Sequence, residues 1–90
     1  MVTFEKDKRF CDEFAIFVKS NPRSAFKIAI LLDDIQRHPT SGIGKPERLK
    51  RRLIPTYSRR INDKDRLVYA YDEVAEIVKL LSCRGHYEDK

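Results

Sequence analysis

Two apolar stripes at helical spacing, separated by one Asn-Pro step, occupy the first half of this 90-residue chain. In the first stripe Phe10, Phe14 and Phe17 recur every three or four residues, and Asp7 before them is a favourable N-cap residue. The second stripe, which ends before the next proline, contains Ala25, Ile28, Ala29, Leu32 and Ile35. The Asn-Pro step at 21–22 interrupts the first helix, and proline suits the first turn of the next. The pattern predicts two paired helices whose shared apolar face has to be covered by a sheet.

The rest of the chain has the pattern of short strands joined by tight turns. Residues 2–5 begin with alternating apolar and polar side chains, which favours a short strand before the helices. Residues 57–61 and 66–71 favour a hairpin whose turn is 62–65, and residues 75–81 favour a third strand. Consecutive strands with short turns pair antiparallel. We therefore expect an α+β fold of order β-α-α-β-β-β, in which two N-terminal helices pack on a small antiparallel sheet.

Two segments allow more than one local structure. Residues 74–83 also match the 3.6-residue period of a helix. Propensity favours the strand only weakly, and the Asp-Glu turn before it supports the strand. Residues 45–50 could form a helical turn with Pro46 in its first position. In such a turn Glu47 and Lys50 would share a face and could form an ordinary ion pair.

Length and composition exclude several classes of protein. Ninety residues without an internal repeat, a low-complexity tract or a Gly/Ser linker predict a single domain over residues 1–90. With 41% hydrophobic and 37% charged residues, the chain is neither disordered nor membrane-embedded by composition. No apolar run approaches the roughly 20 residues of a spanning helix, and the N-terminus lacks the apolar core of a signal peptide. We therefore expect a soluble cytoplasmic protein without membrane contact.

The positive charge is concentrated in one segment. The net charge of the chain is +5, but residues 45–66 alone carry nine basic and three acidic side chains, a net of +6. The nine basic residues are Lys45, Arg48, Lys50, Arg51, Arg52, Arg59, Arg60, Lys64 and Arg66. A largely one-signed segment repels itself, and it is typical of a surface that binds polyanions, nucleic acid first. The alternative is a solvated face, which is the commoner meaning of a charge run.

The cysteines and histidines do not form a metal-binding pattern. Cys11 and Cys83 lie far apart, and His38 and His86 stand at none of the spacings of a zinc site. We expect two reduced thiols, with Cys11 on a helix that packs, and neither a bound metal nor a cofactor.

Several residues in and around the basic segment could together cleave RNA without a metal. Transesterification needs a base for the 2′-hydroxyl, an acid for the 5′-oxygen and cations for the charge that develops at phosphorus. Glu47 can be the base, and His86, which can hold a proton near pH 7, can be the acid. Arg66, with Arg60 and Lys50, can stabilise the negative charge. Each of these groups also has an ordinary structural explanation. Glu47 could form an ion pair, the arginines could lie at an exposed hairpin end, and the stretch with His86 could be a frayed C-terminal tail.

Four motifs in this order resemble those of a known family. They are Gly-Lys-Pro-Glu-Arg-Leu-Lys at the end of 39–50, Tyr-Ser-Arg-Arg-Ile at 57–61, Arg-Leu-Val-Tyr at 66–69 and Cys-Arg-Gly-His-Tyr at 83–87. From residue 1 to 87 the chain resembles the YoeB/Txe family of bacterial toxins, part of the RelE superfamily of ribosome-dependent mRNA interferases. The resemblance implies a RelE-like fold and an endoribonuclease that cuts mRNA in the ribosomal A site, leaves a cyclic phosphate and needs no metal.

The resemblance also implies roles for individual residues. Glu47 would be the general base, Arg66 would stabilise the transition state, and His86 would be the general acid. The residues expected to bind substrate are Lys50, Arg59, Arg60 and Tyr87. The two adjacent arginines point to opposite faces of an extended strand, so only one of them can line a given surface.

Partners are implied in the same way. Family toxins are neutralised by a YefM/Phd-type antitoxin whose acidic, apolar C-terminal segment wraps the toxin. The pair represses its own operon, so operator DNA would be contacted only through the antitoxin complex. The other expected partners are the ribosome and mRNA, and family members can dimerise. The alternatives are a non-catalytic RNA- or DNA-binding module of the same fold that acts with an antitoxin, and a general RNA-binding domain.

The chain departs from the family pattern at four places. Pro55 stands near the aromatic residue of the second motif, where the family usually has a glycine. Asp65 precedes Arg66, where the family often has histidine, and Gly85 replaces an aromatic residue before the final His-Tyr. Residues 88–90 extend beyond the usual terminus. None of these departures removes an expected catalytic residue.

Overall fold

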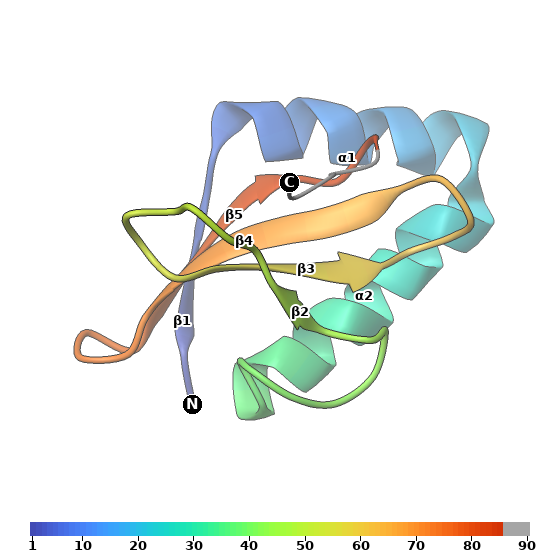
Figure 1. Ribbon diagram of the computed structural model, residues 1–90. Coiled ribbons are helices and arrows are strands. Elements are labelled where there is room, and N and C mark those ends of the chain that lie inside the picture. The colour runs from blue at the N-terminus through green and yellow to red at the C-terminus, as the bar shows by residue number, and fades with distance from the viewer. Residues whose placement is uncertain (86–90) are drawn as a thin grey trace.

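Two helices cover one face of a five-stranded sheet in this computed structural model, which describes residues 1–85 (Figure 1). In chain order the elements are β1 (Thr3–Lys6), α1 (Lys8–Ser20), α2 (Pro22–Arg37), β2 (Glu47–Arg48), β3 (Thr56–Arg60), β4 (Arg66–Asp72) and β5 (Ile77–Ser82). The predicted α+β class and the predicted order of strand, two helices and three strands are confirmed. The structure adds one short strand, β2, between the helices and the predicted hairpin.

The sheet is mixed, with the strand order β1-β5-β4-β3-β2. β3, β4 and β5 form the predicted antiparallel meander, and β2 pairs antiparallel with β3. β1 instead runs parallel to β5, with Thr3 opposite Ile77. The expectation of a purely antiparallel sheet is corrected at this edge, because the alternation within a strand specifies neither its partner nor its direction.

One Asn-Pro step ends the first helix and begins the second, as predicted. The backbone N–H of Asn21 donates to the Phe17 carbonyl at the end of α1. The Asn21 side chain then caps α2 by accepting the Ser24 N–H at 3.2 Å, and Pro22 occupies the first turn. Asp7 does stand at the N-cap of α1, although its side chain makes no capping hydrogen bond.

The segment before β2 does not form the predicted helical turn. Gly44 and Lys45 both have positive φ angles, 78° and 51°, so the chain turns there in the left-handed region and continues extended. β2 then pairs with β3 instead of coiling. The helical prediction for 45–50 is wrong, and with it the helical ion pair between Glu47 and Lys50.

The strand interpretation of the last predicted element is confirmed, and the helical alternative for 74–83 is wrong. A turn precedes β5 and is held by Asp72, whose Oδ1 accepts the N–H groups of Val74 at 3.1 Å and Ala75 at 3.0 Å. Glu76 has a φ of 55°, which ends the turn and starts the extended path. Residues 73–76 form this turn, and the rest of the segment pairs with β4 as β5.

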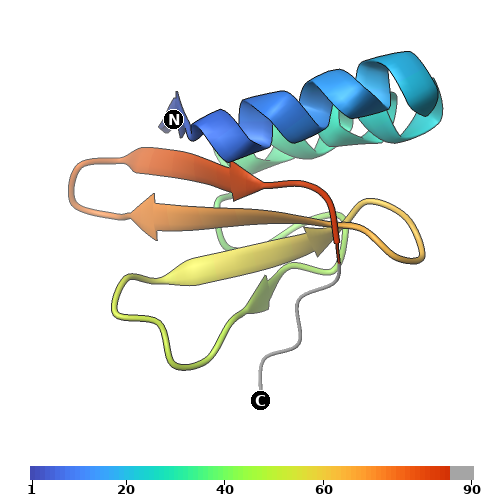
Figure 2. The same ribbon diagram turned by 90° about the horizontal axis from the view of Figure 1, so that it is seen from above.

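The core lies between the two helices and one face of the sheet (Figure 2). The side chains buried most completely in it are Ile28, Leu31, Ile35, Leu67, Tyr69, Val78, Leu80 and Cys83. The opposite side of the sheet carries no helix, and we call it the helix-free face. Within residues 1–85, no helix has the length and apolar character needed to cross a membrane.

Both cysteines are free, but they differ in environment. Cys83 is fully buried, and burial, together with the carboxylates of Glu13 and Asp65, raises the pKa of its thiol to about 12. Cys11 lies on α1, a helix that packs as expected, but its own side chain is exposed. Cys83 is the cysteine that contributes to the core.

A thiol reagent such as iodoacetamide should modify Cys11 in the native protein and leave Cys83 unmodified. The thiolate is the reactive form, and both burial and the raised pKa of Cys83 keep its thiol protonated. Mass spectrometry after labelling at about pH 8 should show one adduct on the native protein and two after denaturation. The native Cys11→Ser variant should show none, and two adducts on native wild-type protein would contradict the prediction.

Candidate active site

Strand register brings three of the predicted site residues to the helix-free face. Arg60 at the end of β3 lies opposite Arg66 at the start of β4, and opposite residues of an antiparallel pair point to the same face. Glu47 lies opposite Ser58, which is two residues from Arg60 and therefore shares its face. Glu47, Arg60 and Arg66 thus line one surface across three neighbouring strands, which are spaced about 4.8 Å apart in a sheet.

The Glu47 carboxylate is exposed on the edge strand β2. Among the described residues, no hydrogen bond or ion pair reaches it. Both carboxylate oxygens are therefore available to accept a proton from a bound molecule. Residues 1–85 contain no group of three or more His, Cys, Asp or Glu side chains that could hold a metal ion.

Arg66 is half-buried, and its guanidinium group is anchored to the β3–β4 turn. Its Nη1 donates to the carbonyls of Asn62 at 2.9 Å and Asp65 at 3.1 Å. Asn62 also shapes this turn, because its Oδ1 accepts the N–H groups of Lys64 and Asp65 at 2.9 and 2.8 Å. Nε and Nη2 of Arg66 have no partner in the described part of the chain, so they can donate to an anion.

The chain that follows β5 returns to Arg66. The Arg66 N–H donates to the Gly85 carbonyl at 3.0 Å, and the Asp65 carboxylate accepts the Gly85 N–H at 2.9 Å. The described chain therefore ends beside Arg66. His86 and Tyr87, the expected acid and aromatic substrate contact, follow Gly85 in the sequence and lie outside the described residues. Their roles stay predictions.

Arg59 does not lie on this surface. It pairs with Leu67 on the core side of the sheet, and 0% of it is exposed. The expectation that Arg59 contacts substrate is wrong, because its guanidinium group is enclosed by protein. Adjacent residues of a strand face opposite sides of the sheet, and the register places Arg60 on the helix-free face and Arg59 on the core side.

All five N–H donors of the buried Arg59 guanidinium group have acceptors. Nε donates to the Tyr69 hydroxyl at 3.1 Å, and Nη1 donates to Oδ2 of Asp34 at 2.5 Å. The other three donors bind the carbonyls of His38 (2.5 Å), Ser41 (2.8 Å) and Ile43 (3.0 Å). The Tyr69 hydroxyl in turn donates to the Pro39 carbonyl at 2.7 Å. These acceptors hold the loop between α2 and β2 at several points.

Arg59 therefore has a structural role that sequence reasoning missed: it fixes the loop at 38–44 that leads to Glu47. Asp34 contributes from α2 by accepting the Ile43 N–H at 3.1 Å. The loop passes so close to this carboxylate that a Cβ atom at Gly42 would lie 2.0 Å from Asp34 Oδ2. Only glycine fits there without a shift of the carboxylate, and the φ of 115° also favours glycine.

Acid should weaken the fold through Asp34. Burial alone would raise the pKa of Asp34, but the hydrogen bonds from Arg59 and Ile43 and the charge of Arg59 hold it below its ordinary value. Such a group stabilises the fold above its unfolded pKa of about 3.9 and loses this contribution as pH falls through its folded pKa. The unfolding free energy of wild type, measured in urea, should approach that of Asp34→Asn as pH falls from about 6 to about 3. A difference in unfolding free energy between the two proteins that stays constant over this pH range would contradict the prediction.

Lys50 lies in an exposed loop between β2 and β3, outside the strand register that aligns the other site residues. Residues 50–54 are all exposed, and the Lys50 carbonyl accepts a hydrogen bond from Arg52 at 3.0 Å. Leu53 and Ile54 are exposed apolar side chains beside these cations. Of the nine basic residues in 45–66, seven are exposed, Arg66 is half-buried and Arg59 is buried. The basic segment therefore keeps most of its charge accessible to a polyanion.

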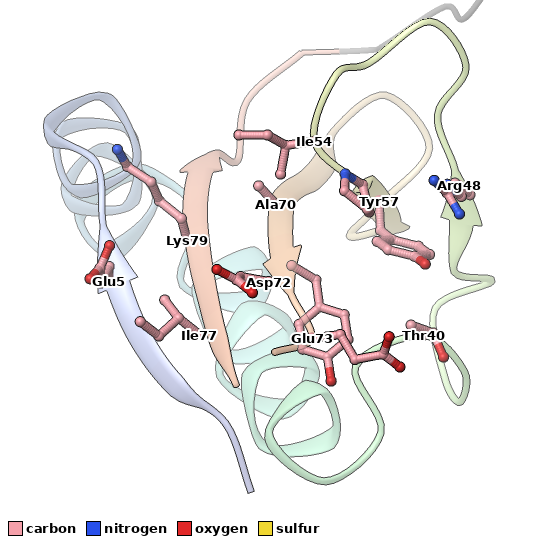
Figure 3. A pocket seen from close by; sticks show the side chains of 12 residues that line it. Glu5, Thr40, Arg48, Ile54, Tyr57, Ala70, Asp72, Glu73, Ile77 and Lys79 are labelled. Atoms are coloured by element: carbon pink, nitrogen blue, oxygen red, sulfur yellow. The ribbon is translucent and has the colours of Figure 1, made fainter. Parts of the chain in front are cut away.

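A cavity of about 610 Å³ opens toward the other end of β4. Glu5 and Lys79 lie on one side of it, and Arg48 and Tyr57 lie on the other (Figure 3). None of the three residues aligned by the register lines this cavity. The candidate active site thus lies outside this cavity.

Known proteins are similar to this chain in sequence and in fold. Residues 5–87 match the model of a family described as the YoeB-like toxin of bacterial type II toxin-antitoxin systems. Toxin YoeB of Mycobacterium bovis is 40% identical over 86 residues, 96% of each chain. The YoeB dimer from Staphylococcus aureus matches with a TM-score of 0.85 and 37% identity, over 96% of this chain and 98% of that one. A YoeB-YefM complex from Staphylococcus aureus matches with a TM-score of 0.81 and 38% identity, over 97% and 99%.

Proposed function

This chain belongs to the YoeB-like toxin family of bacterial type II toxin-antitoxin systems, and from that we propose that it is an endoribonuclease acting on ribosome-bound mRNA. The proposed toxin cuts mRNA in the ribosomal A site and arrests translation. The observation that supports this most is the shared exposed face of Glu47, Arg60 and Arg66. It joins a carboxylate that has no partner within residues 1–85 to two cations, the groups that RNA transesterification needs besides an acid.

In the proposed reaction Glu47 takes the proton of a 2′-hydroxyl, and the 2′-oxygen forms a bond to the neighbouring phosphorus. The bond from phosphorus to the 5′-oxygen breaks, and His86 gives its proton to the leaving oxygen. Arg66, through its unpaired N–H donors, and Arg60 stabilise the negative charge that builds up on the phosphoryl oxygens. The products are a 2′,3′-cyclic phosphate and a 5′-hydroxyl end. Side chains alone supply the base, the acid and the cations, so the proposed reaction uses no metal.

The exposure of Glu47 and Arg60 fits a substrate that something else holds in place. The exposed cations of 45–66 can contact ribosomal RNA phosphates, and the ribosome aligns the mRNA against the site. Alignment of this kind can supply several kcal/mol of the barrier reduction. We therefore expect fast cleavage on the ribosome, slow cleavage of free RNA, and activity in the cytoplasm, where ribosomes are.

A YefM-type antitoxin is the proposed partner that blocks this activity. YoeB of Staphylococcus aureus is known in a complex with YefM and as a dimer. We extend both assemblies to this chain as a proposal. An acidic, apolar antitoxin segment would complement the cations of 45–66 and the exposed Leu53 and Ile54. Operator DNA would then be contacted only through the antitoxin.

The deciding experiment adds the purified protein to ribosomes programmed with a defined mRNA and, in parallel, to the same mRNA free in solution. The proposal expects cuts in the ribosome-bound message that end in a cyclic phosphate, little cutting of the free message, and inhibition by a YefM-type antitoxin. A non-catalytic binding module would leave both messages intact. A general RNA-binding domain would bind the free message tightly, with a strong dependence on salt concentration.

A further inference from the structure

The chain that follows β5 is held by two carboxylates from distant parts of the sequence. Glu13 on α1 accepts, through Oε1, the backbone N–H groups of Cys83 at 2.8 Å and Arg84 at 3.2 Å. Asp65, in the β3–β4 turn, accepts the N–H of Gly85 through Oδ1 at 2.9 Å. Carboxylates thus bind three consecutive peptide N–H groups with charge-assisted hydrogen bonds, which fixes the path of the backbone here.

Asp65 is itself held in place. It is buried, with 6% of its surface exposed, and its second oxygen, Oδ2, accepts a hydrogen bond from Nδ2 of Asn62 at 2.9 Å. The same Asn62 nitrogen donates to the Ser24 hydroxyl at the start of α2, also at 2.9 Å. Both oxygens of Asp65 therefore have partners. The carboxylate cannot turn away from Gly85 without leaving buried polar groups unpaired.

These contacts attach Gly85 to Arg66. Asp65 accepts the Gly85 N–H, and the next residue, Arg66, donates its own N–H to the Gly85 carbonyl at 3.0 Å. Two bonds in opposite directions therefore fix both sides of Gly85 against the start of β4. Gly85 has a φ of 99°, which residues with a Cβ atom rarely adopt, so the backbone here follows a path that glycine permits.

We propose that Asp65 is a positioning residue, which holds Gly85 against Arg66 and so fixes the point from which the chain continues to His86. This inference rests on the proposed function, because it concerns the residue to which the proton transfer is assigned. Consecutive Cα atoms are about 3.8 Å apart, so a fixed Gly85 restricts where the next residue begins. Misplacement of a catalytic group by about 1 Å can cost about 100-fold in rate. Asp65 acts only through the backbone and touches no reacting atom.

Asp72 offers a matched control at the other end of β4. Its carboxylate also holds a turn, by accepting the N–H groups of Val74 and Ala75. Asp72→Ala therefore removes the same kind of contact, carboxylate to backbone N–H, at the end of β4 away from Arg66. A general loss of turn stability should affect Asp65→Ala and Asp72→Ala alike, whereas a loss of positioning should affect only Asp65→Ala.

The test measures single-turnover cleavage of ribosome-bound mRNA by the full-length variants. Asp65→Ala should lower the maximal rate constant about 10- to 100-fold, while the ribosome concentration at half-maximal rate changes less than about threefold. Asp65→Asn keeps an acceptor oxygen for Gly85 but points an amide N–H at the Asn62 donor, so its rate should lie between those of wild type and Asp65→Ala. Asp72→Ala should stay within about threefold of wild type. In hydrogen exchange, the Gly85 amide should be protected in wild type and Asp65→Asn but exposed in Asp65→Ala.

An Asp65→Ala rate equal to that of wild type, or equal losses in Asp65→Ala and Asp65→Asn, would overturn this role for Asp65. If Asp65→Ala does not fold, Gly85→Ala tests the same contact. A Cβ atom there meets nothing within 4 Å among the described residues but disfavours the observed φ. The same loss of rate is therefore expected, and an unchanged rate would overturn the role. A wild-type protein that cuts no ribosome-bound mRNA would overturn the proposed function itself, and this role with it.

Discussion

Replacing Arg59 by methionine should lower the free energy of unfolding by about 3–5 kcal/mol, as expected when one partner of a buried ion pair is removed. The substitution removes five hydrogen bonds at once and leaves Asp34 without its cation. Three carbonyls of the loop at 38–44 lose their donors, and unpaired buried acceptors are costly. Methionine has an unbranched side chain that can follow the arginine stem, so the loss reports mainly on the polar network.

Arg60→Met is the matched control, because the same change is made one residue away on an exposed side chain. It should alter the free energy of unfolding by no more than about 0.5 kcal/mol. Urea unfolding followed by circular dichroism measures both variants. Similar losses in the two proteins would contradict the assignment of Arg59, and not Arg60, to the structural network.

Replacing Glu47 by glutamine should lower the rate of cleavage of ribosome-bound mRNA by about 100- to 10,000-fold, the usual contribution of a general base. Glutamine keeps the shape of glutamate but cannot take the proton of a 2′-hydroxyl. The free energy of unfolding should change by less than about 0.5 kcal/mol, because Glu47 is exposed and its carboxylate has no partner among residues 1–85. Single-turnover kinetics and urea unfolding separate the two effects.

Glu73→Gln provides the control for the charge change. Glu73 is an exposed carboxylate in the turn between β4 and β5, away from the register that aligns Glu47 with Arg60 and Arg66. Its variant should cleave at the wild-type rate, and both variants should bind ribosomes as wild type does. Full activity of Glu47→Gln would exclude Glu47 as the base, and equal losses in both variants would indicate a general effect of charge.

The helices and the β3–β5 meander could be predicted because their signals are local. Apolar spacing, the Asn-Pro step and alternation within strands each depend on residues close together in sequence. The two strands at the edges of the sheet lack such signals. β2 is too short to show a period, and its extended path depends on the left-handed turn at Gly44 and Lys45. The parallel direction of β1 depends on its pairing with the far end of the chain.

The candidate site could be predicted only in part, for the same reason. Alternation separated Arg59 from Arg60, but only pairing with β4 decides which of them faces the helices. The acid that neutralises Arg59 is 25 residues away on α2, so the sequence pattern gave no sign of a buried pair. The alignment of Glu47 with Arg66 also depends on pairing across three strands. The motifs indicated which residues matter, and the register decides where they lie.

The parallel pairing of β1 with β5 has a consequence for how the protein is made. Thr3 lies opposite Ile77, so the first strand to be synthesised has no partner strand until residue 77 has been made. Contacts between such distant segments close a long loop and form late in folding. A copy whose residue 77 is still inside the ribosome that is making it therefore lacks its complete sheet. In the proposed toxin this late closure of the sheet leaves an interval for an antitoxin to bind before any ribosome is attacked.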